Sequence, residues 1–258
     1  MNKIRSIKKI EKVILAVLML GTINLFANNV KIALAANVAY AIPKLKAEFK
    51  KDFPNTKVQV TLSSSGKLAA MIENGASYDI FMSANMKYPQ RLYKDKLAVT
   101  KPVIYAQGAL AYLSEAKQDF SKGIKLTLEK KIRKIALADP RTAPYGKASV
   151  EALKNGGVYE IAVKKCVYAS SISSAVTYTL TAANLGFIAK SSLYSPKMKR
   201  FKKGINWTEV NPKLYTPISQ GIVLLNQGEK NKDAKAFYKF ILSSKAKKIF
   251  KDFGYKVP

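Results

Sequence analysis

A short run of serines and a glycine holds the residues of this chain best suited to binding an anion. The segment Thr61–Leu68 reads Thr-Leu-Ser-Ser-Ser-Gly-Lys-Leu, and it joins an apolar strand to a helix with Met71 and Ile72 on its apolar side. The first N–H groups of a helix lack partners within the helix, and the helix dipole adds partial positive charge there. The junction therefore predicts an anion site, although serine is also an ordinary helix N-cap.

Four junctions of this kind occur, each built from small or neutral polar residues between a strand and a helix. They are Ala35–Val38, Ser63–Gly66, Thr142–Gly146 and Ser170–Ser173. In open α/β sheets, ligands bind beyond the carboxyl ends of the strands, where helix starts converge. Two junctions belong to the first half of the fold and two to the second. We therefore expect a cleft between two units to bring them to one ligand.

The residue types in these junctions favour a fully ionised oxyanion. The nearest charged residues are Lys67, Asp139, Arg141 and Lys147, and three of the four loops contain no carboxylate. A partly protonated anion such as phosphate needs an acceptor for its proton, whereas a tetrahedral dianion needs donors only. The set points to molybdate, tungstate or sulfate. Asp139 precedes Pro140 and alternatively caps its own turn.

Strand-like and helical segments alternate along the chain, which predicts mainly parallel sheets covered by helices on both faces. Strands are expected at Val30–Leu34, Val58–Leu62, Asp79–Met82, Ile135–Ala138, Val167–Ala169 and Gly186–Ala189. Helices are expected at 38–49, 68–74, 88–93, 233–242 and 245–253, and others carry Val150 with Leu153 and Val176 with Leu180. Extended segments at 103–113 and 215–225 are candidate crossings between the units. The expected division is lobe 1 at 28–106 and 217–258, and lobe 2 at 107–216.

Residues 1–27 have the features of a signal peptide rather than of a folded segment. Five Lys and Arg residues precede an apolar stretch from Val13 to Leu25, and the small residue Ala27 follows. We expect export to the periplasm and a mature protein that begins near Asn28. A retained N-terminal anchor is the alternative.

The composition excludes several chemistries. Histidine is absent and Cys166 is the only cysteine, so the chain cannot build an internal disulfide, an ordinary Cys/His zinc site or a Ser-His-Asp triad. We expect Cys166 to be a buried core thiol. The formal charge is +29, and +25 without residues 1–27, which contain five Lys/Arg and Glu11. The lysines are scattered, so solvated faces are expected rather than a nucleic-acid interface.

In order and content the junctions resemble those of the molybdate-binding proteins of bacterial ABC transporters, over essentially all of the chain after the leader. Segment 63–84, from Ser-Ser-Ser-Gly-Lys-Leu to Asp-Ile-Phe-Met-Ser-Ala, is the most specific part of the resemblance. Segment 138–146, Ala-Asp-Pro-Arg-Thr-Ala-Pro-Tyr-Gly, is similar to a second family motif, and 236–255 is similar to the family's terminal helices.

The resemblance implies the α/β type II periplasmic-binding-protein fold, with two lobes, mainly parallel sheets, two connecting strands and the anion in the cleft. Carried over by position, it implies binding by Asn37, Ser65, Tyr145 and Ile172, the last two through backbone N–H groups. Further candidates are Ala36, Ser64 and Arg141. The metal would be bound only as its oxyanion, and no separate cofactor is implied.

Two positions depart from the family pattern. Some members have Ser where this chain has Asn37, whose amide can also donate. Some use a Tyr hydroxyl at the position of Ala189, so one donor is missing here. The Thr-Thr-Thr-Ser run expected of dedicated tungstate binders is absent.

We interpret the chain as a periplasmic solute-binding protein, a monomer that captures molybdate and also tungstate and delivers it to an inner-membrane ABC permease. The expected mechanism is binding with domain closure, without catalysis. The alternative is a basic envelope protein that binds anionic surfaces or polymers through its lysines, with a steep loss of affinity in salt. A hydrolase using Ser65 is a third reading, which lacks a visible adjacent base.

Overall fold

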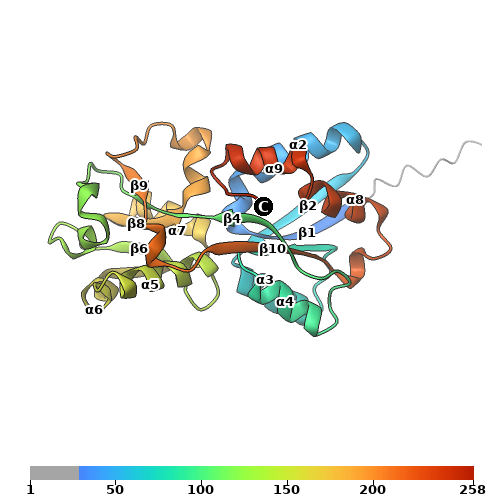
Figure 1. Cartoon of the computed structure of the whole chain (residues 1–258), viewed down its shortest axis with the longest axis horizontal. Coiled ribbons are helices and arrows are strands. Elements are labelled where there is room, and N and C mark those ends of the chain that lie inside the picture. Colours follow the sequence, from blue (N-terminus) through green and yellow to red (C-terminus); the bar gives the residue numbers. More distant parts are fainter. Residues whose placement is uncertain (1–28) are drawn as a thin grey trace, which may run out of the picture.

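The computed structural model describes residues 29–258, which form two lobes lying side by side (Figure 1). The leader predicted at 1–27 lies outside the described residues. Each lobe is built on a five-stranded sheet, and the chain crosses between the lobes along β4 (Val103–Gly108) and returns into β10 (Ile218–Leu224). The crossings predicted from the extended segments are therefore present.

The sheet of the first lobe is mixed. Its strand order is β2 (Lys57–Ser63), β1 (Asn29–Ala35), β3 (Ile80–Met82), β10 and β4. Strand β1 pairs in parallel with β2 and β3, whereas β10 pairs antiparallel with β3 and β4. The βαβ alternation predicts the parallel pairs, and the crossing strands add the antiparallel ones.

The sheet of the second lobe repeats this plan. Its strand order is β7 (Cys166–Ala169), β6 (Ile135–Ala138), β8 (Leu185–Ala189), β5 (Leu110–Leu113) and β9 (Trp207–Glu209). Strand β6 is parallel to β7 and β8, and β5 is antiparallel to β8 and β9. In both lobes the parallel strands lead into the helices that carry the predicted junctions.

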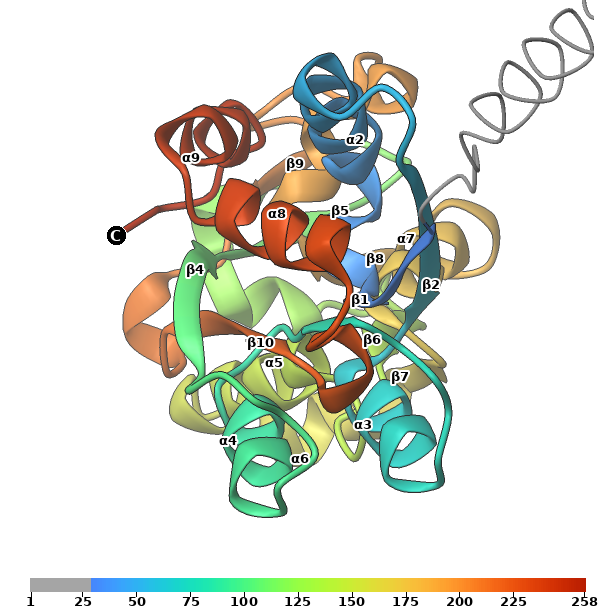
Figure 2. The ribbon, with the colours of Figure 1, turned by 90° about the vertical axis from the view of Figure 1, so that its right-hand side faces the viewer.

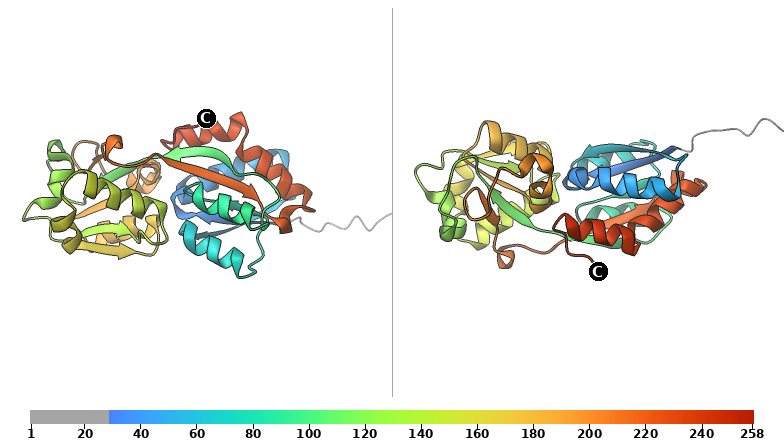
Figure 3. Two further views of the ribbon diagram at one scale, coloured as in Figure 1. Left: turned by 60° about the horizontal axis from the view of Figure 1, so that its bottom comes forward. Right: turned by 90° about the horizontal axis from the view of Figure 1, so that it is seen from above.

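Helices cover both faces of the first sheet, as Figures 2 and 3 show. On one face lie α2 (Ile42–Asp52), α8 (Lys232–Ile241) and α9 (Ser244–Asp252); on the other lie α3 (Ser65–Glu73) and α4 (Lys87–Lys94). Alternate β1 residues point to opposite faces: Ile32 packs under α2 and α8, and Ala33 under α3. Among the described residues, no helix is both long and apolar enough to cross a membrane.

In the second lobe, α5 (Pro144–Asn155) and α6 (Tyr159–Ala162) pack with Leu110 and Tyr112. On the opposite face Val176 of α7 (Ile172–Thr181) packs with Ala111 and Ile188. Several short elements were not expected from the sequence, namely α6, β9 and the 3-10 helices η2 (Phe120–Leu128), η3 (Val163–Lys165), η4 (Lys190–Tyr194), η5 (Pro196–Met198), η6 (Pro212–Leu214) and η7 (Asn226–Gly228). The helix expected at 38–49 is divided into the 3-10 helix η1 (Ala36–Tyr40) and α2.

The single cysteine differs from its expectation. Cys166 at the start of β7 is half-buried rather than fully buried, and its thiol donates to the Ala162 carbonyl at 3.2 Å. Desolvation raises the pKa of the Cys166 thiol to about 11. The thiol therefore stays protonated and packs at the margin of the core.

The start of α5 lies directly against the end of β6. A Cβ atom at Gly146, in the first turn of α5, would lie 2.1 Å from the Ala138 carbonyl oxygen. Backbone atoms cannot move aside as a flexible side chain can, so only glycine permits this approach. The contact places the first turn of α5 where its N–H groups reach the cleft.

We expect Gly146→Ala to lower the free energy of unfolding by about 1–3 kcal/mol, because the added methyl group overpacks this contact. Urea denaturation followed by circular dichroism measures the change. Lys147→Ala, an exposed substitution on the same turn, should stay within about 0.5 kcal/mol of wild type. Equal stability of the two variants would contradict the close approach.

Candidate anion-binding site

A small cavity lies between the lobes, and all four predicted junctions reach it. Its volume is ≈ 10 Å³, far too small for a sugar or an amino acid. Its walls are Ala35, Ala36, Asn37, Ser63, Ser64, Ser65, Ala84, Ala143, Pro144, Tyr145 and Ile172. The structure thus brings together the four residues predicted as principal ligands, together with Ala36 and Ser64.

Three α-helices begin at the cavity wall. Helix α3 begins at Ser65, α5 at Pro144 and α7 at Ile172. The backbone N–H groups of Ser65, Tyr145 and Ile172 fall in first turns, where no intrahelical partner exists. The 3-10 helix η1 adds a further start at Ala36. The cavity therefore faces the positive ends of three helix dipoles from both lobes.

The serine hydroxyls at the start of α3 are available as donors. Ser65 Oγ accepts a hydrogen bond from the Ala84 N–H at 2.9 Å, so its own proton remains free to donate. Ser64 Oγ is buried and has no hydrogen-bond partner among the described residues. A buried hydroxyl without a partner is uncommon in a folded protein, and an anion in the cavity would supply the missing acceptor.

The Asn37 side chain does not behave as the sequence suggested. Its amide nitrogen donates to Gln220 Oε1 at 2.9 Å and to the Tyr255 hydroxyl at 3.1 Å, so both amide hydrogens are used within the protein. In this arrangement the amide hydrogens are directed to protein acceptors, and Asn37 Oδ1 is buried without a partner among the described residues. The backbone N–H of Asn37, at the cavity wall, is the donor that remains.

Arg141 lies outside the cavity. Its side chain is 85% exposed and forms an ion pair with Asp139 at 2.7 Å. The Asp139 carboxylate also accepts the Arg141 backbone N–H at 3.0 Å, which is the turn-capping alternative considered for it. The hydrogen bond from Arg141 lowers the pKa of Asp139. The charges of this loop thus neutralise one another beside the cavity.

The remaining wall chemistry contains neutral donors only. Ala189, at the end of β8, is not among the residues that line the cavity. Within residues 29–258, no group of three or more His, Cys, Asp or Glu side chains could ligate a metal ion directly. The site can bind an anion through N–H and O–H donors, and it offers no general base beside Ser65.

The two lobes touch around the cavity. The Gly66 N–H donates to the Thr142 carbonyl at 2.8 Å, and Ser191 Oγ donates to the Asn37 carbonyl at 3.0 Å. Ala36 and Ala84 of the first lobe pack into the main core of the second. The structure is therefore the closed arrangement of the lobes.

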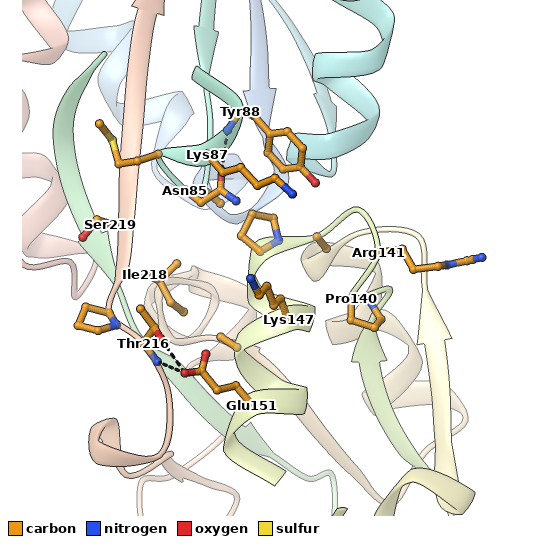
Figure 4. A pocket seen from close by; sticks show the side chains of 16 residues that line it. Asn85, Lys87, Tyr88, Pro140, Arg141, Lys147, Glu151, Thr216, Ile218 and Ser219 are labelled. Carbon is orange, nitrogen blue, oxygen red and sulfur yellow. Dashed lines mark hydrogen bonds between the residues drawn. The ribbon is translucent and has the colours of Figure 1, made fainter. Parts of the chain in front are cut away.

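A larger pocket of ≈ 330 Å³ adjoins the cavity, because Ala84, Ala143 and Pro144 line both. Figure 4 shows Lys87 and Lys147 entering it from opposite lobes, while Arg141 points away. Glu151 accepts hydrogen bonds from the Thr216 N–H at 3.0 Å and hydroxyl at 2.6 Å. Lys87 and Lys147 thus add positive charge, and Glu151 negative charge, to a pocket that adjoins the cavity. Sequence reasoning noted Lys147 but missed Lys87, which lies outside the junctions.

Comparison with known proteins identifies the family. Residues 30–256 match the model of the family described as bacterial extracellular solute-binding proteins. The chain belongs to this family. Its relatives include the molybdate-binding proteins ModA of Azotobacter vinelandii, 33% identical over 232 residues, and of Rhodobacter capsulatus, 33% identical over 233 residues. These matches cover 89% of this chain in both cases, and 90% and 88% of the respective relatives.

The solved structures agree. The periplasmic molybdate-binding protein of Azotobacter vinelandii superimposes with a TM-score of 0.80 at 30% identity, covering 89% of this chain and 99% of that one. The two-lobe binding-protein fold and the family resemblance read from the junctions are both confirmed.

The two cavity serines should differ in their effect on folding. Ser65→Ala leaves the buried Ala84 N–H without an acceptor, so we expect the free energy of unfolding of the ligand-free protein to fall by about 1–3 kcal/mol. Ser64→Ala removes a hydroxyl that has no partner and should change it by less than about 0.5 kcal/mol. Denaturant unfolding without added oxyanion measures both. A larger loss for Ser64→Ala would contradict this assignment of the hydrogen bonds.

Proposed function

We propose that this protein captures molybdate, and also tungstate, and delivers it to an ABC permease of the inner membrane. The observation that carries the proposal is a small cavity between the lobes whose walls, drawn from both lobes, contain N–H and O–H donors and no carboxylate. The ligands named for the Azotobacter and Rhodobacter relatives are consistent with this chemistry.

Neutral donors are well suited to holding a dianion away from water. A hydrogen bond to a charged group contributes about 1.5–3 kcal/mol, roughly twice a neutral one. The principal ligands in this proposal are Ser65, through hydroxyl and N–H, with the backbone N–H groups of Asn37, Tyr145 and Ile172. Ser64 adds a hydroxyl, and Ala36 lies at the wall.

Closure is the mechanism that follows from this donor set. The first lobe supplies Asn37 and Ser65, and the second supplies Tyr145 and Ile172. An anion can contact all of them only when the lobes are closed, so binding shifts the population toward that form. Binding and release, rather than bond-making catalysis, are therefore the proposed activity.

Several further features belong to the same proposal. Residues 1–27 would direct export to the periplasm, where the protein would act as a monomer without a cofactor or nucleic acid. The lobes would divide at 28–106 with 217–258, and at 107–216, because the crossing strands leave and re-enter near these positions.

Calorimetric titration with molybdate, tungstate, sulfate and phosphate tests the function. We expect Kd values for molybdate and tungstate in the micromolar range or tighter, on the order of −8 kcal/mol or better. Sulfate has the same charge and shape but is smaller, so it should bind far more weakly, and protonated phosphate lacks an acceptor. Comparable sulfate affinity would reject the assignment. Affinity that falls steeply with salt and ignores anion type would favour the basic surface-binding alternative.

Arg141→Gln tests whether the site is neutral. Because the Arg141 side chain is exposed and paired with Asp139, we expect molybdate affinity to change by less than about 1 kcal/mol, with a difference that shrinks in high salt. Lys67→Gln provides a matched exposed control on α3. A loss above about 2 kcal/mol that persists in high salt would show direct contact between Arg141 and the anion.

A further inference from the structure

Gln220 is a fully buried polar residue in the largely apolar strand β10, where that strand re-enters the first lobe. The pairing of β10 with β4 is irregular there: Gln220 pairs with Ala106 and Gly221 with Ile104, which leaves Tyr105 as an extra residue in β4. A β-bulge of this kind redirects a side chain. Here Tyr105 is fully buried, and its hydroxyl reaches Gln220 Oε1 at 2.8 Å.

The Gln220 amide connects residues of both lobes. Its Oε1 also accepts from Asn37 Nδ2 at 2.9 Å, and its Nε2 donates to the Tyr145 hydroxyl at 3.2 Å. Asn37 and Tyr145 are cavity residues on opposite sides of the cleft. The Asn37 carbonyl is held as well, by the hydroxyls of Tyr255 at 2.8 Å and Ser191 at 3.0 Å.

The Tyr145 side chain meets the crossing strand at a position with no room for a side chain. A Cβ atom at Gly108 in β4 would lie 1.9 Å from the Tyr145 hydroxyl and 2.7 Å from Gln220 Nε2. Tyr145 therefore packs directly against the backbone of Gly108 in the crossing strand β4. The Tyr145 hydroxyl thus contacts the crossing strands, and Tyr145 also lines the cavity.

We infer that Gln220 is a positioning residue for the anion site: its buried amide joins the Asn37 loop of the first lobe to Tyr145 of the second and holds their backbone donors in the closed register. This inference rests on the proposed function. The Asn37 contact lies within the first lobe, whereas the Tyr145 contact bridges the two lobes. Gln220 is not among the residues that line the cavity, so it acts through Asn37 and Tyr145.

The chemistry of the network suits this role. One amide can accept from the first lobe and donate to the second at the same time, which neither a carboxylate nor a hydrocarbon side chain can do. Burial raises the pKa values of the Tyr105 and Tyr145 hydroxyls well above their ordinary value. These hydroxyls therefore remain neutral, and the network places no negative charge beside a bound anion.

Gln220→Met keeps the side-chain length but removes all three hydrogen bonds. We expect molybdate affinity, measured by calorimetry, to fall at least about tenfold, because donors on Asn37 and Tyr105 lose their acceptor and closure loses one bond. Gln107→Met, half-buried on the other crossing strand, β4, is the control and should bind as wild type does.

A double-mutant cycle separates positioning from a role in folding alone. Tyr145→Phe removes only the hydroxyl and should weaken molybdate binding about 2–10-fold. In the Tyr145→Phe background, Gln220→Met should cause a smaller fold-loss than in wild type, because their shared bond is already gone. If the two losses simply multiply, or if Gln220→Met binds as tightly as wild type, the inference is overturned.

Failure of the proposed function can be distinguished from failure of the positioning role by the wild-type titration. If the proposed function is wrong, wild type binds neither molybdate nor tungstate, and the positioning role is rejected as well. Should Gln220→Met not fold, Tyr145→Phe still decides: unchanged affinity for molybdate rejects the bridge across the hinge, and a several-fold loss supports it.

Discussion

Backbone N–H groups at the start of a helix have no hydrogen-bond partners within that helix. Both lobes direct several such groups toward the cleft between them. Strands β1, β2, β6 and β7 end at the cleft, and η1, α3, α5 and α7 begin there. Parallel strands place successive helix starts on one edge of a sheet. Two such edges facing each other enclose a volume in which an anion is favoured by geometry and by the helix dipoles.

The crossing strands make this arrangement adjustable. Strands β4 and β10 pair with each other antiparallel in the first lobe, and they continue into segments that lead to and from the second (Figure 1). Contacts between the lobes near the cavity include hydrogen bonds, such as Gly66 with Thr142, and the packing of Ala36 and Ala84 into the core of the second lobe. A ligand that adds several hydrogen bonds to donors of both lobes would shift the population further toward the closed form.

Buried polar groups at the hinge have a cost unless every one is paired. The side-chain amides of Gln220 and Asn37 lie among the hydroxyls of Tyr105, Tyr145 and Tyr255, and these groups satisfy one another except for Asn37 Oδ1, which has no partner among the described residues. Such a network specifies one closed register more narrowly than apolar packing does. The unpaired Ser64 hydroxyl lies instead at the cavity wall, where a ligand can reach it.

Most elements could be predicted because local periodicity and burial agree. Ile135–Ala138 was expected as a strand and is β6, and the predicted helix at 68–74 is the main part of α3. Short elements such as β9 (Trp207–Glu209) contain too few residues to show a hydrophobic period in the sequence. The antiparallel positions of β5 and β10 depend on where the chain crosses between lobes, which no local pattern records.

The sequence by itself determined the two-lobe α/β plan, the neutral character of the donors and the junctions that supply them, because these depend on residue type and spacing. Only the tertiary structure decided how each side chain is used. It turned the Asn37 amide toward Gln220, paired Arg141 with Asp139 and left the Ser64 hydroxyl unpaired. A buried polar group forms hydrogen bonds with the groups that the fold places next to it. Because such neighbours can be distant in the sequence, local sequence patterns do not predict these bonds.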